Sequence, residues 1–162
     1  RWLIMNTHGN PKASAMLEQQ HRAIDDGIRP VLDGAGDLPA LRQALDLLRL
    51  HLFLEEEILF PMLEQHGVTM PVFVMKREHG QMWPWLQQLT QACAAGAEPS
   101  SLHDACGELF KLLQIHNTKE EQIVYVAADD IAARGLEEPL WATLDATEHV
   151  PDDWVCAMAP RR

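Results

Sequence analysis

Apolar residues recur every three or four positions through most of the chain, with polar residues between them. Because an α-helix has 3.6 residues per turn, this spacing gathers the apolar side chains on one face of a helix. The pattern predicts four long amphipathic helices, over about residues 14–32, 38–65, 70–95 and 101–130. It also predicts a short helix over about residues 138–146.

Short segments that contain glycine or proline separate the predicted helices, and short loops make consecutive helices antiparallel neighbours. The predicted fold class is therefore all-α, an up-down-up-down four-helix bundle with a short C-terminal helix and tail. We expect an N-terminal arm at residues 1–13, the bundle at 14–130, and a short helix and tail at 131–162 that pack on the bundle. Trp141 and Trp154 are expected to lie on the bundle, with a homodimer contact as the alternative.

Polar residues interrupt the apolar face of every long helix. Each face carries one histidine, and the second and fourth faces also carry a glutamate four residues after it, so that the two side chains lie one turn apart. The second face continues through Ile58 and Met62, and the fourth through Ile123 and Ala127. The six inward polar residues are His21, His51, Glu55, His79, His116 and Glu120.

These six residues are the predicted metal ligands. Burying a carboxylate costs several kcal/mol unless it has a partner, and the inward faces contain no lysine or arginine. Bound cations would supply that partner, and a carboxylate can bridge two ions about 3.5–4 Å apart. Imidazole with carboxylate suits iron, with manganese or zinc possible. We therefore expect two non-haem iron ions with a bridging water, hydroxide or oxo group.

Other polar residues receive weaker interpretations. Glu56 and Glu121 lie one position off the inward faces, where either a supporting role beside the ligands or a solvated position is expected. Tyr125 falls off the predicted face and is not assigned as a redox residue. The remaining histidines are expected to be surface residues rather than ligands: His8, His66, His103 and His149.

The two His-x-x-x-Glu helices with a histidine on each partner helix resemble the hemerythrin family of HHE cation-binding domains. The resemblance spans about residues 14–130 and implies that the six inward residues are the metal ligands. Oxygen-carrying hemerythrins have His-x-x-x-His on the third helix, where this chain has Met75 before His79. Their fourth-helix carboxylate follows its histidine by five residues rather than four. Both departures are similar to bacterial hemerythrin-like proteins linked to iron-sulfur repair, nitric oxide response or iron sensing.

Charge and cysteine content limit the expected partners and cellular location. A net charge of −11 argues against nucleic acid and anionic membranes as partners, because both require basic surface. No apolar run is long enough to span a membrane. Three widely spaced cysteines without a C-x-x-C pair fit a reducing, cytoplasmic setting. The chain is expected to be a monomer or a homodimer.

Three functions remain open at this point. The first is a di-iron protein that binds or senses a small diatomic ligand, dioxygen or nitric oxide, or iron availability. The second is a di-iron enzyme on the same centre, a peroxidase or oxidase, or a repair protein that donates iron to damaged iron-sulfur clusters. The third is a metal-free helical module for phosphotransfer or docking, which the inward and acid-flanked histidines disfavour.

Overall fold

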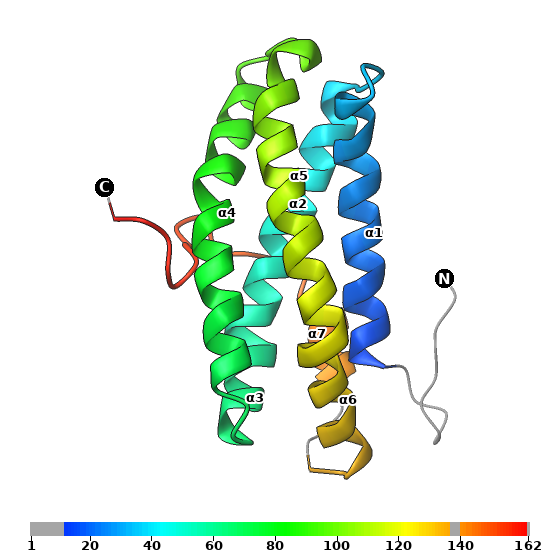
Figure 1. Ribbon diagram of the computed structural model, residues 1–162, viewed down its shortest axis with the longest axis vertical. Helices are drawn as coiled ribbons and strands as arrows, with labels where there is room; N and C mark the ends of the chain where they lie inside the picture. Colours follow the sequence, from blue (N-terminus) through cyan, green and yellow to red (C-terminus); the bar gives the residue numbers. More distant parts are fainter. Residues whose placement is uncertain (1–11, 137–139, 162) are drawn as a thin grey trace.

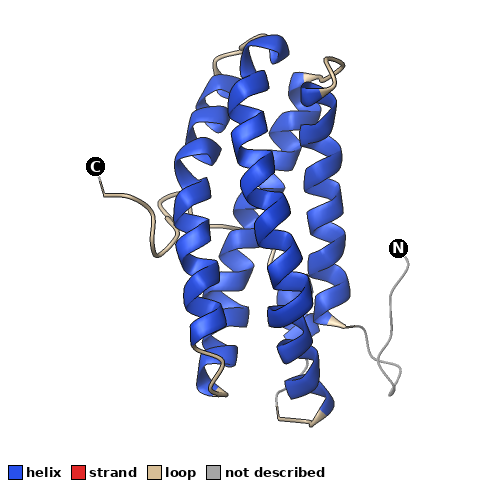
Figure 2. Cartoon of the chain, viewed as in Figure 1, coloured by secondary structure: helices blue, strands red, loops and turns tan. Residues whose placement is uncertain are grey.

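The computed structural model describes residues 12–136 and 140–161. Every regular element in these ranges is a helix (Figure 2). Residues 1–11 of the predicted arm, with His8, lie outside the described residues, as does the predicted start of the short helix at Glu138.

The elements follow one another with short connections. Two segments, η1 and η3, are π-helical and continue the helices before and after them, whereas η2 is a 3₁₀ turn that opens α5. The elements are α1 (Ala13–Leu32), α2 (Leu38–Leu54), η1 (Glu55–Leu59), α3 (Phe60–Gln65), α4 (Met70–Ala94), η2 (Pro99–Leu102), α5 (His103–Lys119), η3 (Glu120–Val124), α6 (Tyr125–Ala133) and α7 (Leu140–Ala146).

The long helices α1, α2, α4 and α5 lie side by side (Figure 1). Helix α1 packs against α2 and α5, and α4 packs against the same two helices. The space between them holds two apolar clusters. One cluster includes Ile24, Leu52, Met82 and Leu113. The other lies toward the opposite ends of the helices and includes Leu17, Leu54, Met75 and Val124.

The two π-helical segments shift which residues face inward. In a π-helix each hydrogen bond spans five residues rather than four, so one extra residue is accommodated in a turn. The N–H of Phe60 accordingly donates to the carbonyl of Glu55, and that of Tyr125 to the carbonyl of Glu120. The inward pattern after each glutamate is displaced by one position as a result.

Of the predicted inward residues beyond the glutamates, Ile58 and Ile123 are therefore wrong, whereas Met62 is buried as predicted and Ala127 is half-buried. Ile58 is only half-buried, whereas its neighbour Leu59 is completely buried. Ile123 is 51% exposed, whereas Val124 is 1% exposed. A regular α-helical repeat allows either the third or the fourth residue after each glutamate to face inward, and the extra residue of the π-helical turn selects the fourth.

Residues 147–161 leave α7 and cross α2 and η1 to reach α4, near the C-terminal end of the trace in Figure 1. The indole of Trp154 lies edge-on to Phe53 and to Trp83, with ring centroids 5.4 and 5.5 Å apart. Trp141, in α7, is half-buried. Helix α7 itself contacts α1 and η1. The described part of the C-terminal region thus lies against the helices on which the polar residues sit.

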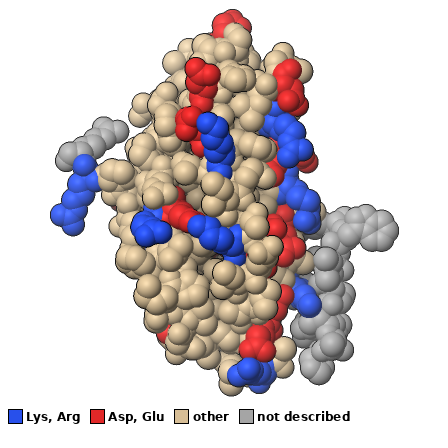
Figure 3. Space-filling view, in the orientation of Figure 1, with Lys and Arg blue, Asp and Glu red and all other residues tan. Residues whose placement is uncertain are grey.

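The outer surface is mixed in charge. On the face that Figure 3 shows, lysine and arginine side chains lie among aspartate and glutamate side chains rather than in one continuous patch. Of the helices in the described ranges, none has both the length and the apolar content needed to cross a bilayer.

Candidate metal centre

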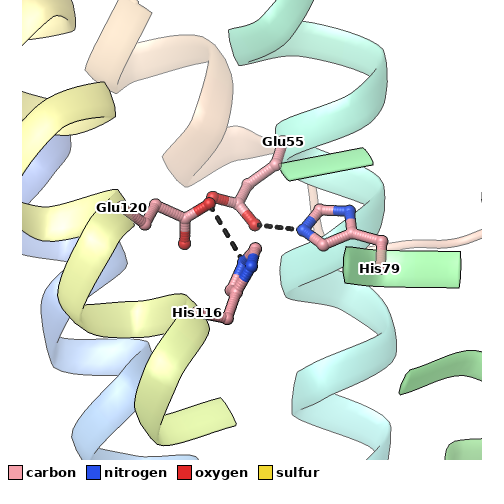
Figure 4. Close-up of side chains that lie close together, drawn as sticks. All are labelled: Glu55, His79, His116 and Glu120. Carbon is pink, nitrogen blue, oxygen red and sulfur yellow. Dashed lines mark ion pairs between the residues drawn. The ribbon is translucent and has the colours of Figure 1, made fainter. Parts of the chain in front are cut away.

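The six polar residues predicted to face inward meet between the two apolar clusters. Each side chain is fully or almost fully buried, with exposed fractions between 0% and 3%. Helices α1, α2, α4 and α5 supply one histidine each, and the π-helical segments η1 and η3 begin with the two glutamates. Figure 4 shows Glu55, His79, His116 and Glu120 pointing toward one another from four different elements.

The donor atoms form two groups that share a carboxylate. The first, the His79 cluster, consists of Glu55, His79, His116 and Glu120, and the second, the His21 cluster, consists of His21, His51 and Glu120. Within each cluster one ligand atom per residue lies within 4.8 Å of all the others. Glu120 belongs to both clusters, and Glu55 Oε1 also lies 3.1 Å from His51 Nε2. Both carboxylates therefore lie between the two clusters.

All four imidazoles are oriented by a partner on their outer nitrogen. The partner is a carboxylate in three cases and the Gln20 amide oxygen in the fourth. Because each oxygen accepts, the outer nitrogen carries the proton and the inner Nε2 presents a lone pair. The Nδ1 contacts are His21 to Glu121 at 2.9 Å, His51 to Gln20 at 2.7 Å, His79 to Glu56 at 2.9 Å and His116 to Glu78 at 2.8 Å.

The inner nitrogens of His21 and His51 lie 3.0 Å apart. Two lone pairs that face each other at this distance repel unless a proton or a cation lies between them. Two nitrogens bound about 2.0–2.1 Å from one metal ion are about 3 Å apart when they subtend a right angle at it. The spacing thus fits either a hydrogen bond through one proton or two ligands of one ion.

Several inward atoms have no hydrogen-bond partner. Among the described residues, the buried side-chain atoms left in this state are Glu55 Oε1, His79 Nε2, His116 Nε2 and Glu120 Oε2, together with Asn117 Oδ1. The imidazole nitrogens of His79 and His116 lie 3.4 and 3.3 Å from the glutamate oxygens beside them, yet they form no hydrogen bond. Buried polar atoms nearly always have a hydrogen-bond partner, so these unpaired nitrogen and oxygen atoms are consistent with a cation bound among them.

Charges in the cluster perturb each other strongly. Burial is the largest single influence on the pKa of His116 and would lower it, but the charge and polar contact of Glu120 and the hydrogen bond to Glu78 together outweigh burial and raise that pKa to about 10. The pKa of His51 is raised to about 9, because the charges of Glu55 and Glu120 and the polar contacts with them together outweigh the effect of burial. The pKa of Glu120 is held well below its usual value against the effect of burial, chiefly by His116. Without a cation, protons on His51, His79 and His116 thus balance the buried carboxylates.

Tyr125 lies beside the converging residues, so its predicted position off the inward face is wrong. Its side chain is 1% exposed, and its hydroxyl lies 2.9 Å from Glu55 Oε2 and 2.9 Å from Glu120 Oε1. The same hydroxyl lies 3.2 Å from Nε2 of His21. Burial, followed by the charges of the two glutamates, raises the pKa of Tyr125 well above its usual value, so the phenol stays protonated. The π-helical turn brings this residue inward.

Glu56 and Glu121 lie beside the converging residues, since each accepts a hydrogen bond from one of their imidazoles. Glu56 is buried, and Glu121 remains partly exposed. The sequence analysis missed two further partners of this kind, Gln20 and Glu78. Glu78 also pairs with Lys119. The three surface histidines within the described ranges are exposed, as expected: His66, His103 and His149.

The donor set suits a cation of the iron, manganese or zinc kind, because it combines imidazole nitrogens with carboxylate oxygens and is closed to bulk water by burial. Comparison with protein-family models finds a match to the Hemerythrin HHE cation binding domain, over residues 12–128. Comparisons with curated proteins and with solved structures found no match. The match covers most of the chain and includes all six converging residues. The chain therefore belongs to the hemerythrin HHE cation-binding family.

Proposed function

We propose that this chain holds two non-haem iron ions, one in each cluster, and uses them to bind or sense a small diatomic ligand, dioxygen or nitric oxide, or to report iron availability. The ligands in this proposal are His21, His51, Glu55, His79, His116 and Glu120. The observation that carries it is the convergence of four Nε2 lone pairs on carboxylates shared between two clusters. Manganese or zinc could occupy the same donors, and a water, hydroxide or oxo bridge would complete the centre.

The proposal includes an up-down-up-down four-helix bundle. Its support is the order in which each helix meets the two apolar clusters. Helices α1 and α4 pass from the cluster of Leu17 and Met75 to the other cluster, whereas α2 and α5 with their π-helical extensions pass in the opposite sense. Such alternation places the middle of every helix at one level, which is where the histidines occur. The domain division at residues 13 and 130 belongs to the same proposal.

The proposed setting is the cytoplasm, in a monomer or homodimer without nucleic-acid or membrane partners. Its support is the acidic net charge of −11 and the state of the three cysteines, which are all free and buried. Burial raises the pKa of Cys106 to about 11, which keeps that thiol protonated and unreactive.

An apolar pocket beside the His79 cluster would admit a diatomic ligand. The pocket, of about 300 Å³, lies between α4 and η3, and its walls include Met75, Val124 and the stem of Lys119. Met75 is four residues before His79, and Val124 is four residues after Glu120, so both lie one helical turn from ligands. Iron bound in the cluster would supply an open coordination position and one-electron redox chemistry.

The test is titration of the reduced, iron-loaded protein with nitric oxide and with dioxygen, followed by optical spectroscopy. The parent protein should change its spectrum with at least one gas. Met75→His places an imidazole one turn before His79, and we expect it to weaken gas binding about tenfold, since a competing bond of about 1.4 kcal/mol suffices.

Met75→Leu is the matched control, because it keeps the volume of the side chain without a nitrogen donor. It should bind gas as the parent does. A parent spectrum that neither gas alters would contradict diatomic binding, and equal gas affinity in all three proteins would show that no open position lies near Met75.

Tyr125 favours a second candidate, an enzyme that disproportionates hydrogen peroxide. Its hydroxyl is a buried O–H donor 2.9 Å from both shared carboxylates and within 3.4 Å of His51 Nε2. In that reaction one peroxide molecule takes two electrons and two protons and becomes two waters. The second peroxide molecule supplies both and becomes dioxygen, so no further reductant is needed. A positioned phenol can hand over a proton during such a step.

Tyr125→Phe separates this candidate from simple binding. The variant should keep its iron, because all six proposed ligands remain, and should lose peroxide turnover about 10²-fold, the lower end of the effect of a positioned proton donor. Dioxygen release over many turnovers, with iron content measured on the same sample, is the readout. Fewer than one peroxide consumed per iron pair in the parent would exclude the enzyme.

A further inference from the structure

The segment of residues 151–159, here called the C-terminal strap, is fixed across the outside of the metal centre. The Arg49 guanidinium donates to the carbonyl oxygens of Pro151, at 2.7 Å, and Trp154, at 3.1 Å. The Trp154 indole N–H donates to Glu57 Oε1 at 2.9 Å. Cys156 follows and is buried, with an exposed fraction of 3%. These contacts join the strap to α2 and η1 on either side of Glu55.

The strap reaches the proposed ligands through a single carboxylate. The backbone N–H of Ala157 donates to Glu56 Oε2 at 2.8 Å, and His79 Nδ1 donates to Glu56 Oε1 at 2.9 Å. The Glu56 side chain is 3% exposed, so water does not compete for these positions. The two oxygens of one carboxylate thus connect a strap amide to the imidazole of His79.

The strap packs closely against α4 at Gly80. A Cβ atom on this residue would overlap the carbonyl oxygen of Met158, so an alanine cannot be accommodated without moving the strap. Gly80 directly follows His79 and lies in the interior of α4, where glycine costs helix stability relative to alanine. The glycine is therefore explained by the close approach of the strap rather than by the helix.

We propose that the C-terminal strap is a positioning element of the metal centre, in which the docked Ala157 amide holds Glu56 so that Glu56 fixes the ring of His79. This inference rests on the proposed function, since it assigns the strap to the same site. Loss of a group that orients a metal-bound histidine typically weakens metal binding roughly 10–100-fold. Strap docking and metal binding should therefore favour each other, and by the same factor in both directions.

Alkylation of Cys156 measures strap docking in the unmodified protein. Its thiol is buried while the strap is docked and is reached by iodoacetamide when the strap lifts. The labelled residue is identified by peptide mass, with Cys93 and Cys106, both buried among the helices, as internal references. We expect Cys156 in the iron-loaded protein to be labelled about tenfold more slowly than in protein treated with a chelator, while the references change less.

Gly80→Ala measures the coupling in the other direction. This variant should release ferrous iron to a chelator about tenfold faster than the parent. Gly107→Ala on α5 is the matched control, because its new Cβ would lie 3.8 Å from Leu32 in ordinary contact. It should keep the parent's iron release rate. Glu56→Gln is the second variant, since it replaces one of the two acceptor oxygens between the Ala157 amide and His79 while every residue of the strap stays unchanged, and it too should release iron faster.

The outcomes distinguish the strap from the centre itself. Equal Cys156 labelling with and without iron, together with a parent-like release rate in both Gly80→Ala and Glu56→Gln, would overturn the strap proposal and leave the metal centre intact. A parent protein that takes up no iron at all would instead remove the proposed function. Faster iron release in Gly107→Ala as well would show that any helix glycine is sensitive and would also overturn the strap proposal.

Discussion

The His116→Ala variant should bind iron at least about 100-fold less tightly than the parent and should lose most of its iron during purification. His116 Nε2 has no hydrogen-bond partner among the residues that the structure describes and lies in the His79 cluster with Glu55 and Glu120. Loss of a group that merely orients a ligand costs roughly 10–100-fold in affinity, so loss of the ligand should cost more. Metal analysis of protein reconstituted with ferrous iron and then desalted gives the result directly.

His103→Ala is the matched control for this experiment. His103 begins the same helix, α5, but its side chain is 56% exposed and contacts only Asp104 among the charged groups near it. The control should retain the parent's iron content and spectrum. Full iron occupancy in His116→Ala would remove this residue from the ligand set.

Removal of iron from the parent should lower its melting temperature by about 10 °C. A metal that binds only the folded chain stabilises it by about 4 kcal/mol when its free concentration is about 1,000 times the dissociation constant. For a chain of this size each kcal/mol moves the melting temperature by about 2–4 °C. The physical source is the pair of fully buried carboxylates, Glu55 and Glu120, which lose their cations.

Circular dichroism melts with and without a chelator provide the measurement, and His116→Ala supplies the comparison. The chelator should move the melting temperature of the variant much less than that of the parent, because the variant has little metal to lose. A parent melting temperature that the chelator leaves unchanged would contradict coupling between metal binding and folding.

The helices and the six converging residues could be predicted because both depend on a repeat within one helix. An inward histidine such as His79 occupies a position where the pattern demands an apolar residue, and four such exceptions at mid-helix identify a shared polar layer. The His-x-x-x-Glu spacing fixes the rest, since positions four apart lie on one face. These are local properties of the chain, and the structure bears them out.

The inward faces beyond Glu55 and Glu120 could not be predicted in the same way. A π-helical turn adds one residue without leaving a mark in the composition of the segment. It moves Val124 inward in place of Ile123 and brings the hydroxyl of Tyr125 to the carboxylates. The sequence nevertheless contains a second repeat of equal regularity. Val124, Ala128 and Ile131 follow Glu120 at helical spacing, just as the predicted residues do, and they are the buried ones.

The partners of the imidazoles depend on contacts between helices, which periodicity along one helix does not reveal. Yet each partner is the sequence neighbour of an inward residue on another helix. Gln20 precedes His21 and accepts from His51, while Glu78 precedes His79 and accepts from His116. The acids that follow Glu55 and Glu120 serve the other two histidines. Polar residues directly beside buried ligands were therefore the available signal.

Because those partners differ, metal ions bound in the two clusters are expected to differ in reduction potential. In the His79 cluster both imidazoles, His79 and His116, donate to carboxylates, whereas His51 in the other cluster donates to a neutral amide. A carboxylate behind an imidazole strengthens it as a donor, although Lys119 draws off part of the charge of Glu78. Stronger donation favours the ferric over the ferrous ion. In the proposed two-iron centre, we therefore expect the irons to be oxidised at separate potentials, with the one held by His79 and His116 oxidised first.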